Sequence, residues 1–123
     1  MTVATVVDAS ALAALLFNEP EATAIASRLA GKLYAPGLLA FELANVCLMK
    51  CRRHPDQQTA LIASFRLLET MSVEEVAVNQ AEVLEVALET RLTAYDASYL
   101  WLARRLKADL VTLDKALQAA MAN

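Results

Sequence analysis

Four acidic side chains are the residues of this sequence best suited to chemistry, and they are Asp8, Glu42, Asp96 and Asp114. Asp8 and Asp114 each directly follow a short apolar run of the kind that forms a buried strand. In an open parallel sheet the carboxyl ends of the strands border one crevice, where ligands usually bind. Carboxylates gathered there would repel one another, and a hard divalent cation such as Mg²⁺ or Mn²⁺ would compensate their charge. A centre of this kind indicates chemistry on phosphate esters.

Each of the three aspartates also has an ordinary structural explanation. Asp8 could begin a turn in which Ser10 is the N-cap of the following helix, and Asp114 could cap the last helix of the chain. Asp96 follows Thr93 by three residues, which is the spacing of a capping box. Taken one at a time, these three residues favour the structural interpretation.

Glu42 is harder to explain as a structural residue, because Leu38, Leu39 and Val46 lie at i−4, i−3 and i+4. These positions share one face of a helix, and we expect this apolar face to point inward. Glutamate is almost never buried without a partner. Asn45 at i+3 could share the face and orient the carboxylate. A metal ion at the edge of the core is the simplest partner, and an arginine in a salt bridge is the alternative.

Segments typical of strands and helices alternate along the whole chain. The predicted strands are 2–7, 32–35, 75–78 and 110–113, and the predicted helices span about 9–17, 21–30, 38–53, 56–70, 80–91, 93–107 and from 115 onward. Gly31 would cap the second helix, and Asn79 would be the N-cap of the fifth. The pattern predicts a single α/β domain over residues 1–123, with three α/β/α layers around a parallel sheet of about four strands.

The composition predicts one domain with an excess of apolar residues. The chain has 123 residues, and its hydrophobic fraction of 58% exceeds the usual share of about 45–50%. No apolar run approaches the length of about 20 residues that crosses a bilayer, and the N-terminus lacks the basic region of a signal peptide. We therefore expect a cytoplasmic protein without a membrane segment. The apolar excess indicates an oligomer or partner interface, and a very well-filled core is the alternative.

The charge and the cysteine content restrict the possible functions. The net charge is −3, but setting the four acids aside leaves 10 acidic residues against 11 basic ones. The charge therefore allows an RNA or DNA substrate, although it argues against coating of duplexes, which needs a broad basic face. Cys47, Cys51 and His54 are too few for a conventional zinc site, and two cysteines do not make a disulfide framework. We expect both thiols to be reduced.

Four segments of the chain together resemble the successive motifs of PIN domains. They are residues 6–12 (VVDASAL), 35–45 (APGLLAFELAN), 92–99 (LTAYDASY) and 111–115 (VTLDK). More narrowly, they resemble the VapC toxins of bacterial and archaeal toxin–antitoxin pairs. The resemblance covers nearly the whole chain, and four motifs in the right order and spacing are specific.

The resemblance implies a function and a role for each site residue. It implies that the four acids form a catalytic metal site for Mg²⁺ or Mn²⁺, in an endoribonuclease that cuts RNA such as tRNA or rRNA by metal-activated water. Three further polar residues would orient carboxylates or water, and they are Ser10, Asn45 and Thr112. A cognate antitoxin is also implied, and we expect its tail to lie across the helices at 11–17 and 22–29. We expect the toxin itself to be a homodimer.

Two other functions and one structural question stay open at this stage. The first is a receiver-like phospho-signalling module, in which Lys115 would follow the last strand; however, the middle of the chain is helical and its acid, Glu42, lies in a helix. The second is a PIN-like fold that acts only by binding. Many family members continue past the last helix into a further edge strand, so what covers that edge is also open. Among the aromatic residues, Tyr95 is the candidate for stacking on a base, whereas Trp101 is expected in the core.

Overall fold

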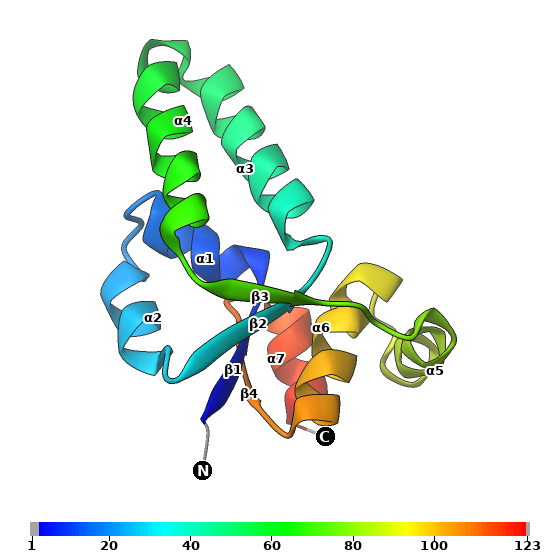
Figure 1. Cartoon of the computed structure of the whole chain (residues 1–123). Helices are drawn as coiled ribbons and strands as arrows, with labels where there is room; N and C mark the ends of the chain where they lie inside the picture. The colour runs from blue at the N-terminus through cyan, green and yellow to red at the C-terminus, as the bar shows by residue number, and fades with distance from the viewer. Residues whose placement is uncertain (1–2, 123) are drawn as a thin grey trace.

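A parallel sheet of four strands forms the centre of the computed structural model, which describes residues 3–122 (Figure 1). The strands are β1 (Ala4–Val7), β2 (Lys32–Pro36), β3 (Val73–Val76) and β4 (Asp109–Val111). Their order is β3-β2-β1-β4, and all three neighbouring pairs are parallel. Because β1 and β4 are neighbours, the residues that follow them emerge side by side at the same edge of the sheet.

Helices cover both faces of this sheet, which confirms the predicted three-layer α/β/α fold (Figure 1). The α-helices are α1 (Ala9–Leu16), α2 (Ala22–Arg28), α3 (Leu39–Arg53), α4 (Gln58–Arg66), α5 (Gln80–Thr90), α6 (Ala94–Leu106) and α7 (Lys115–Met121). Helix α6 packs directly on β1, β2 and β4, with α5 and α7 against it. On the other side, α1 packs against α2 and α3, and the α3–α4 pair projects away from the sheet. The chain runs along the sheet from β1 through β2 to β3 and then returns to β4 at the other edge, and crossovers in opposite directions place their helices on opposite faces.

Side-chain caps define the starts of four helices. Asp8, Asn79, Thr93 and Asp114 each accept a hydrogen bond from the backbone N–H three residues further on, at the starts of α1, α5, α6 and α7. The caps expected at Asn79 and at Asp114 are therefore confirmed. The expected cap at Ser10 is wrong, because Asp8 occupies that position and Ser10 lies inside the first turn of α1. Such caps satisfy N–H groups that have no partner within the helix.

Gly31 has a different role from the predicted helix cap. Helix α2 ends at Arg28 with Leu29 as its C-cap, and Gly31 forms the turn into β2. Its φ is +68°, and a Cβ atom at this position would lie 2.0 Å from the carbonyl oxygen of Val3. Only glycine fits there, because both the left-handed backbone and the close approach exclude a side chain.

Several predicted boundaries are shifted. Strand β1 begins at Ala4, and Thr2, the predicted first strand residue, lies outside the described residues. Strand β3 spans Val73–Val76 rather than 75–78, because it pairs with β2 from Leu33 to Pro36. The helix predicted over 56–70 is α-helical only in α4; the 3₁₀ turns η1 (Pro55–Gln57) and η2 (Leu67–Thr70) flank it. Such tight turns are common at helix ends.

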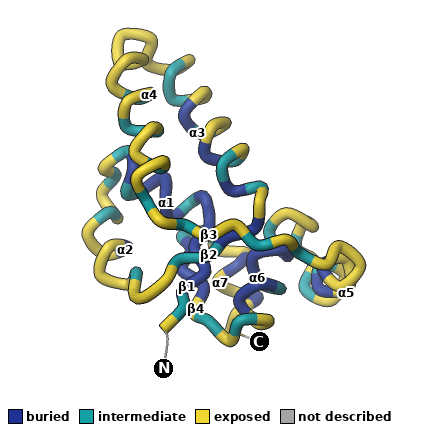
Figure 2. The backbone as a smooth tube through the Cα atoms, in the orientation of Figure 1, coloured by how far each residue is buried: buried dark blue, intermediate teal, exposed yellow. Residues whose placement is uncertain are grey.

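Burial differs sharply between α1 and α4 (Figure 2). In α1, Ala11, Leu12 and Ala14 are completely buried, whereas α4 contains no buried residue. The antitoxin groove expected across α1 and α2 stays a prediction: the apolar face of α1 forms part of the core, whereas most of α2 is exposed and Ile25 is its buried residue. The described residues contain no helix that is long and apolar enough to span a membrane.

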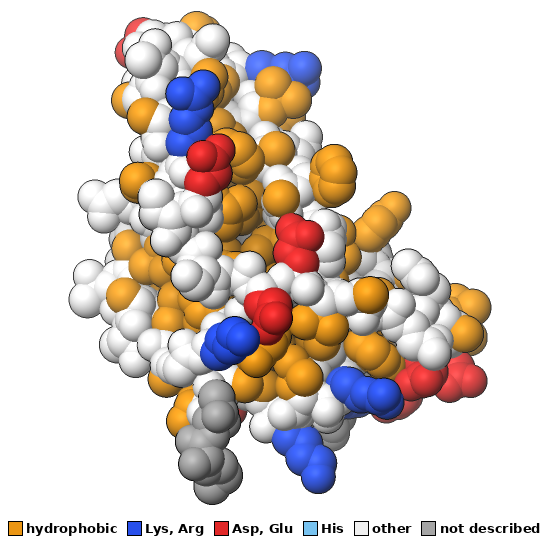
Figure 3. All heavy atoms as spheres, in the orientation of Figure 1, with side chains coloured by type: hydrophobic (Ala, Val, Ile, Leu, Met, Phe, Trp, Pro, Cys, Tyr) orange, Lys and Arg blue, Asp and Glu red, His pale blue; other side chains and the backbone are white. Residues whose placement is uncertain are grey.

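Part of the exposed apolar surface lies on the α3–α4 pair, which Figure 3 shows with apolar side chains on its face. Leu48 and Met49 on α3 and Ile62 on α4 are exposed. Between the two helices runs a groove of about 520 Å³, lined by residues from both helices that include Ala44, Leu48 and Ile62. The apolar excess in the composition thus reflects exposed surface as well as the core.

Candidate active site

Asp8 lies directly after β1 and is only 4% exposed. Its Oδ1 accepts hydrogen bonds from Ser10 Oγ at 2.7 Å and from the backbone N–H of Ala11 at 3.0 Å. Its Oδ2 accepts a hydrogen bond from Thr112 Oγ1. Burial raises the pKa of Asp8 above its ordinary value of 3.8, although these three hydrogen bonds oppose the rise. Both oxygens are therefore held in fixed directions at the end of β1.

Ser10 and Thr112 connect the ends of β1 and β4. The backbone N–H of Leu113 donates to Ser10 Oγ, and the backbone N–H of Asp114 donates to Thr112 Oγ1, both at 2.9 Å. These bonds explain why β4 ends at Val111 rather than at 113 as predicted: the N–H of Leu113 pairs with a side chain instead of a neighbouring strand. They also place Asp114 next to Asp8, as the predicted orienting roles of Ser10 and Thr112 require.

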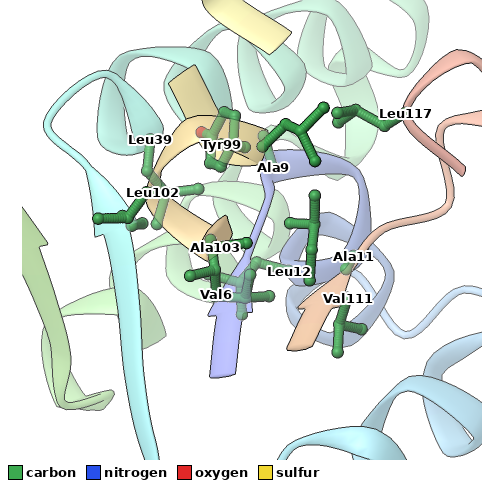
Figure 4. Packing of buried hydrophobic residues seen from close by; sticks show 14 of the residues in the cluster. Val6, Ala9, Ala11, Leu12, Leu39, Tyr99, Leu102, Ala103, Val111 and Leu117 are labelled. Carbon is green, nitrogen blue, oxygen red and sulfur yellow. The ribbon is translucent and has the colours of Figure 1, made fainter. Parts of the chain in front are cut away.

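Glu42 is half-buried on α3, and its partner is a tyrosine. Tyr99 on α6 donates its hydroxyl to Glu42 Oε1 at 2.6 Å. Figure 4 shows Tyr99 among core residues from β1, α1, α3 and α6, and it is only 1% exposed. Burial raises the pKa of Glu42, and the charges of Asp96 and Asp8 add to the rise, while the hydrogen bond from Tyr99 opposes it. Burial also strongly raises the pKa of Tyr99, so its hydroxyl remains a donor.

Asp96 lies in the first turn of α6, where its backbone N–H donates to Thr93 Oγ1 at 3.1 Å. Burial raises the pKa of Asp96 above 3.8, and the charges of Asp114 and Asp8 raise it further. The charge of Asp114 likewise raises the pKa of Asp8. The charges of Asp8, Asp96 and Asp114 thus act on neighbouring carboxyl groups, and together with Glu42 these residues form what is here called the acidic cluster. The chain brings them together from the end of β1, the first turn of α3, the start of α6 and the N-cap of α7 after β4.

The chemistry of the acidic cluster fits a hard divalent cation. Within residues 3–122, no three His, Cys, Asp or Glu side chains already form a group that could hold a metal ion. Mg²⁺ needs no such cage, because it usually keeps several waters and binds to one or two carboxylates and the substrate phosphates. The oxygen-only donor set suits Mg²⁺ or Mn²⁺ rather than a soft metal. The N-termini of α1 and α6 also point their positive dipole ends at the cluster.

The family follows from the comparison with known proteins. Residues 5–122 match the model of the PIN domain family. The chain belongs to the PIN domain family. This PIN domain is 34% identical over 121 residues to Ribonuclease VapC3 of Pyrobaculum aerophilum, a match that covers 91% of the chain and 90% of the relative. The predicted resemblance to VapC proteins is thereby confirmed.

Two solved structures resemble this PIN domain. The crystal structure of PAE2754 from Pyrobaculum aerophilum matches with a TM-score of 0.76 and 32% identity, over 98% of this chain and 87% of the other. VapC20 of Mycobacterium tuberculosis, a toxin that cleaves the sarcin–ricin loop, matches with a TM-score of 0.65 over 94% of each chain. At 19% identity, the second match supports the fold alone.

Two features of the PIN domain's acidic cluster differ from the sequence-based expectations. Asn45 is exposed, whereas Glu42 is half-buried. The buried stripe of α3 runs through Leu39, Leu43 and Cys47, and Glu42 lies at the edge of this stripe. Asn45 lies further around the helix from the stripe than Glu42 does, which explains its exposure. The second difference is Tyr99, to which the sequence analysis assigned no role at the acidic cluster. Its only sequence signal was its position three residues after Asp96 on the same helix.

Proposed function

We propose that this PIN domain is a VapC-like endoribonuclease that hydrolyses RNA with Mg²⁺ or Mn²⁺ and acts as the toxin of a toxin–antitoxin pair. The observation that supports it most is the acidic cluster itself, since four carboxylates share one edge of the sheet, and burial together with the charges of neighbouring acids raises the pKa of Asp8, Glu42 and Asp96. Uncompensated charge of this density favours a cation partner. The name of the 34% identical relative, Ribonuclease VapC3, supports RNA as the substrate.

Each carboxylate has a role in this proposal. Asp8, Asp96 and Asp114 are the main ligands, directly or through water, and Asp8 is fixed by Ser10 and Thr112. When bound, the cation would supply a water of lowered pKa and would offset the charge on the scissile phosphate. Hydrolysis by this route leaves 5′-phosphate and 3′-hydroxyl ends.

Glu42 has one of two roles, both of which need the carboxylate aimed at the other acids. It holds a second cation, or it orients the attacking water. In either case Tyr99 occupies Oε1 by its hydrogen bond and fixes the direction of the carboxylate. The proposed chemistry needs no histidine or thiol, and His54 lies at the C-cap of α3, at the other end of that helix from Glu42.

Control by an antitoxin follows from the proposed ribonuclease activity. A free ribonuclease would damage its host, so we propose that a partner tail places an Arg or Lys near Asp8 and Asp96 and displaces the cation. The apolar part of that partner would bind on the α3–α4 groove, where Leu48 and Ile62 are exposed, rather than on the buried face of α1. A homodimer would bury further exposed apolar residues outside this groove, such as Leu67 in η2.

Sequencing of 5′-phosphate RNA ends tests the proposed function and identifies the substrate. RNA is collected from cells that briefly express the protein, with Asp8→Asn as the control. We expect new ends concentrated at a few sites in structured RNA such as tRNA or rRNA. Equal ends in both samples would favour a PIN domain that acts only by binding.

A further inference from the structure

A second cavity adjoins the acidic cluster at the carboxyl edge of the sheet. It has a volume of about 480 Å³ and lies beyond the ends of β2 and β3, between the starts of α3, α5 and α6. Its walls include Pro36, Leu38, Val76, Val83, Tyr95 and Ser98. We call it the strand-end pocket.

The strand-end pocket shares two elements with the acidic cluster. Tyr95, in its wall, directly precedes Asp96 in the first turn of α6. Leu38, also in its wall, accepts the backbone hydrogen bond of Glu42 one turn along α3. The pocket therefore begins where the acidic cluster ends, along the same edge of the sheet.

The chemistry of the strand-end pocket is opposite to that of the cluster. None of its lining residues carries a charge, and most are apolar. A phosphate would gain nothing in such a pocket, whereas a nucleobase is neutral, planar and largely apolar on its faces. The side-chain amide of Gln80, at the mouth, offers both a donor and an acceptor for a base edge.

Tyr95 supplies the stacking surface. Its side chain is 68% exposed, although it lies in the first turn of a helix whose following residues are buried. Ser98 fixes this turn, because its hydroxyl donates to the backbone carbonyl of Tyr95 at 2.5 Å. An exposed aromatic ring on a fixed turn, at the mouth of an uncharged pocket, is the arrangement that stacks on a base.

We propose that the strand-end pocket is a subsite that receives one nucleobase of the RNA, from a nucleotide next to the scissile phosphate, with Tyr95 stacked on it. This inference rests on the proposed ribonuclease function. The phosphate would lie at the acidic cluster while the adjoining base turns into the pocket. Substrate choice would then depend partly on which base of the RNA can unstack from its neighbours beside the scissile phosphate.

The test measures binding and cleavage of a short fluorescent RNA that carries a mapped cut site. The variants are Tyr95→Ala, Tyr95→Phe and Ala77→Phe, which fills the pocket from the end of β3. Leu88→Ala is the control, because Leu88 is 76% exposed on α5 and is not part of the pocket. Binding is measured in the Asp8→Asn background by fluorescence anisotropy, so that it does not depend on turnover.

We expect Tyr95→Ala and Ala77→Phe to weaken binding and raise KM roughly 5- to 100-fold, with a smaller change in kcat. Tyr95→Phe should retain binding, and Leu88→Ala should match the unmodified protein. An RNA with an abasic nucleotide beside the cut should bind the unmodified protein more weakly by the same factor. With Tyr95→Ala, the abasic RNA and the intact RNA should bind equally. This non-additivity would assign the base to Tyr95.

Three results would overturn the subsite. One is unchanged binding in both pocket variants, and another is an abasic penalty that persists in full with Tyr95→Ala. The third is a change of oligomeric state in Ala77→Phe with unchanged RNA affinity, which would make the pocket an interface between copies. Failure of the proposed function looks different: the unmodified protein would then cleave no RNA in Mg²⁺.

Discussion

The acidic cluster and the α3–α4 pair represent two contrasting ways in which this chain uses its residues. The cluster draws single carboxylates from four separate elements, and side-chain hydrogen bonds between distant residues hold them, such as Thr112 to Asp8 and Tyr99 to Glu42. The α3–α4 pair is continuous in sequence and projects from the sheet with exposed apolar residues. The function proposed for the acidic cluster depends on the positions of individual atoms, whereas the function proposed for the α3–α4 pair depends on its exposed apolar area.

The comparison predicts how each region responds to substitution. In the cluster, one changed atom alters charge or direction at the reacting centre, and such effects on rate are large. On the α3–α4 pair, one exposed side chain contributes a fraction of an interface, and surface substitutions change stability by about 0.5 kcal/mol or less.

The largest effect is expected for Asp8→Asn. It removes one charge from the cluster and one predicted cation ligand, and we expect RNA cleavage to fall by at least about 100-fold. The fold should persist, because asparagine also caps helices well. Asp56→Asn changes an exposed acid in η1 and should leave cleavage unchanged. Cleavage assays and circular dichroism on both variants check this, and an active Asp8→Asn protein would refute the assigned role.

A somewhat smaller effect is expected for Thr112→Val. The substitution keeps the shape of a residue that is 1% exposed but removes the hydroxyl that donates to Asp8 and accepts from Asp114 N–H. Loss of such a supporting bond typically costs about 10- to 100-fold in metal affinity or activity. Titration with Mn²⁺ and cleavage kinetics measure it. Thr23→Val, at an exposed position on α2, is the matched control.

Tyr99→Phe isolates the Glu42 side of the cluster. It deletes only the hydroxyl that donates to Glu42, and we expect kcat to fall about tenfold while the melting temperature changes little. If Tyr99 acts through Glu42, adding Tyr99→Phe to Glu42→Gln should cause no further loss. Fully additive losses would show that Tyr99 contributes independently of Glu42.

The pH dependence of stability gives a more moderate effect. The pKa values of Asp8, Glu42 and Asp96 are raised in the folded protein, so the folded state binds protons more readily than the unfolded state. Their contribution to the stability of the metal-free protein is therefore fully present below pH 4 and is lost as pH rises through the folded-state pKa values. We expect the melting temperature of Asp8→Asn, relative to the unmodified protein, to increase from pH 5 to pH 7.5.

Thermal melts in EDTA, in matched buffers across this range, measure that difference. Added Mg²⁺ should reduce it at neutral pH, because the cation replaces the protons as the charge partner. A relative melting temperature that falls as pH rises would mean that Asp8 is not destabilised by its surroundings.

The smallest effect on catalysis is expected on the α3–α4 pair. Leu48 is 43% exposed and lines the groove, so Leu48→Ser should leave cleavage within about twofold and stability within about 0.5 kcal/mol. It should nevertheless weaken capture of the antitoxin about fivefold or more, as expected for an apolar interface residue. Equal antitoxin affinity of Leu48→Ser and the unmodified protein would mean that the antitoxin binds outside the α3–α4 groove.

The sequence predicted the features that depend on local order. Asp8 and Asp114 follow strands, and because parallel strands end at the same edge, their convergence could be inferred from the alternation of strands and helices. The cap at Asn79 depends on residues within one turn and was also predicted.

The features that sequence reasoning did not predict depend on contacts between distant residues. Tyr99 and Glu42 are 57 residues apart, and the sequence does not show that α3 and α6 present them to each other. Asn45 has the right spacing from Glu42. However, the buried stripe of α3 is centred on Leu43, and Asn45 lies outside this stripe and is exposed to solvent. The burial of α1 was not predicted for a similar reason: an apolar helix can line a groove or fill a core, and only its packing, here against α2 and α3, decides which it does.

The most direct test of the central claim is cleavage of RNA by the purified protein, with identification of the new ends. The reactions contain Mg²⁺ or EDTA and either the unmodified protein or Asp8→Asn. If the acidic cluster is the catalytic centre, 5′-phosphate and 3′-hydroxyl ends should form only with the unmodified protein in Mg²⁺, and adding Mg²⁺ back after EDTA should restore them. Cleavage that survives both EDTA and Asp8→Asn would contradict this account.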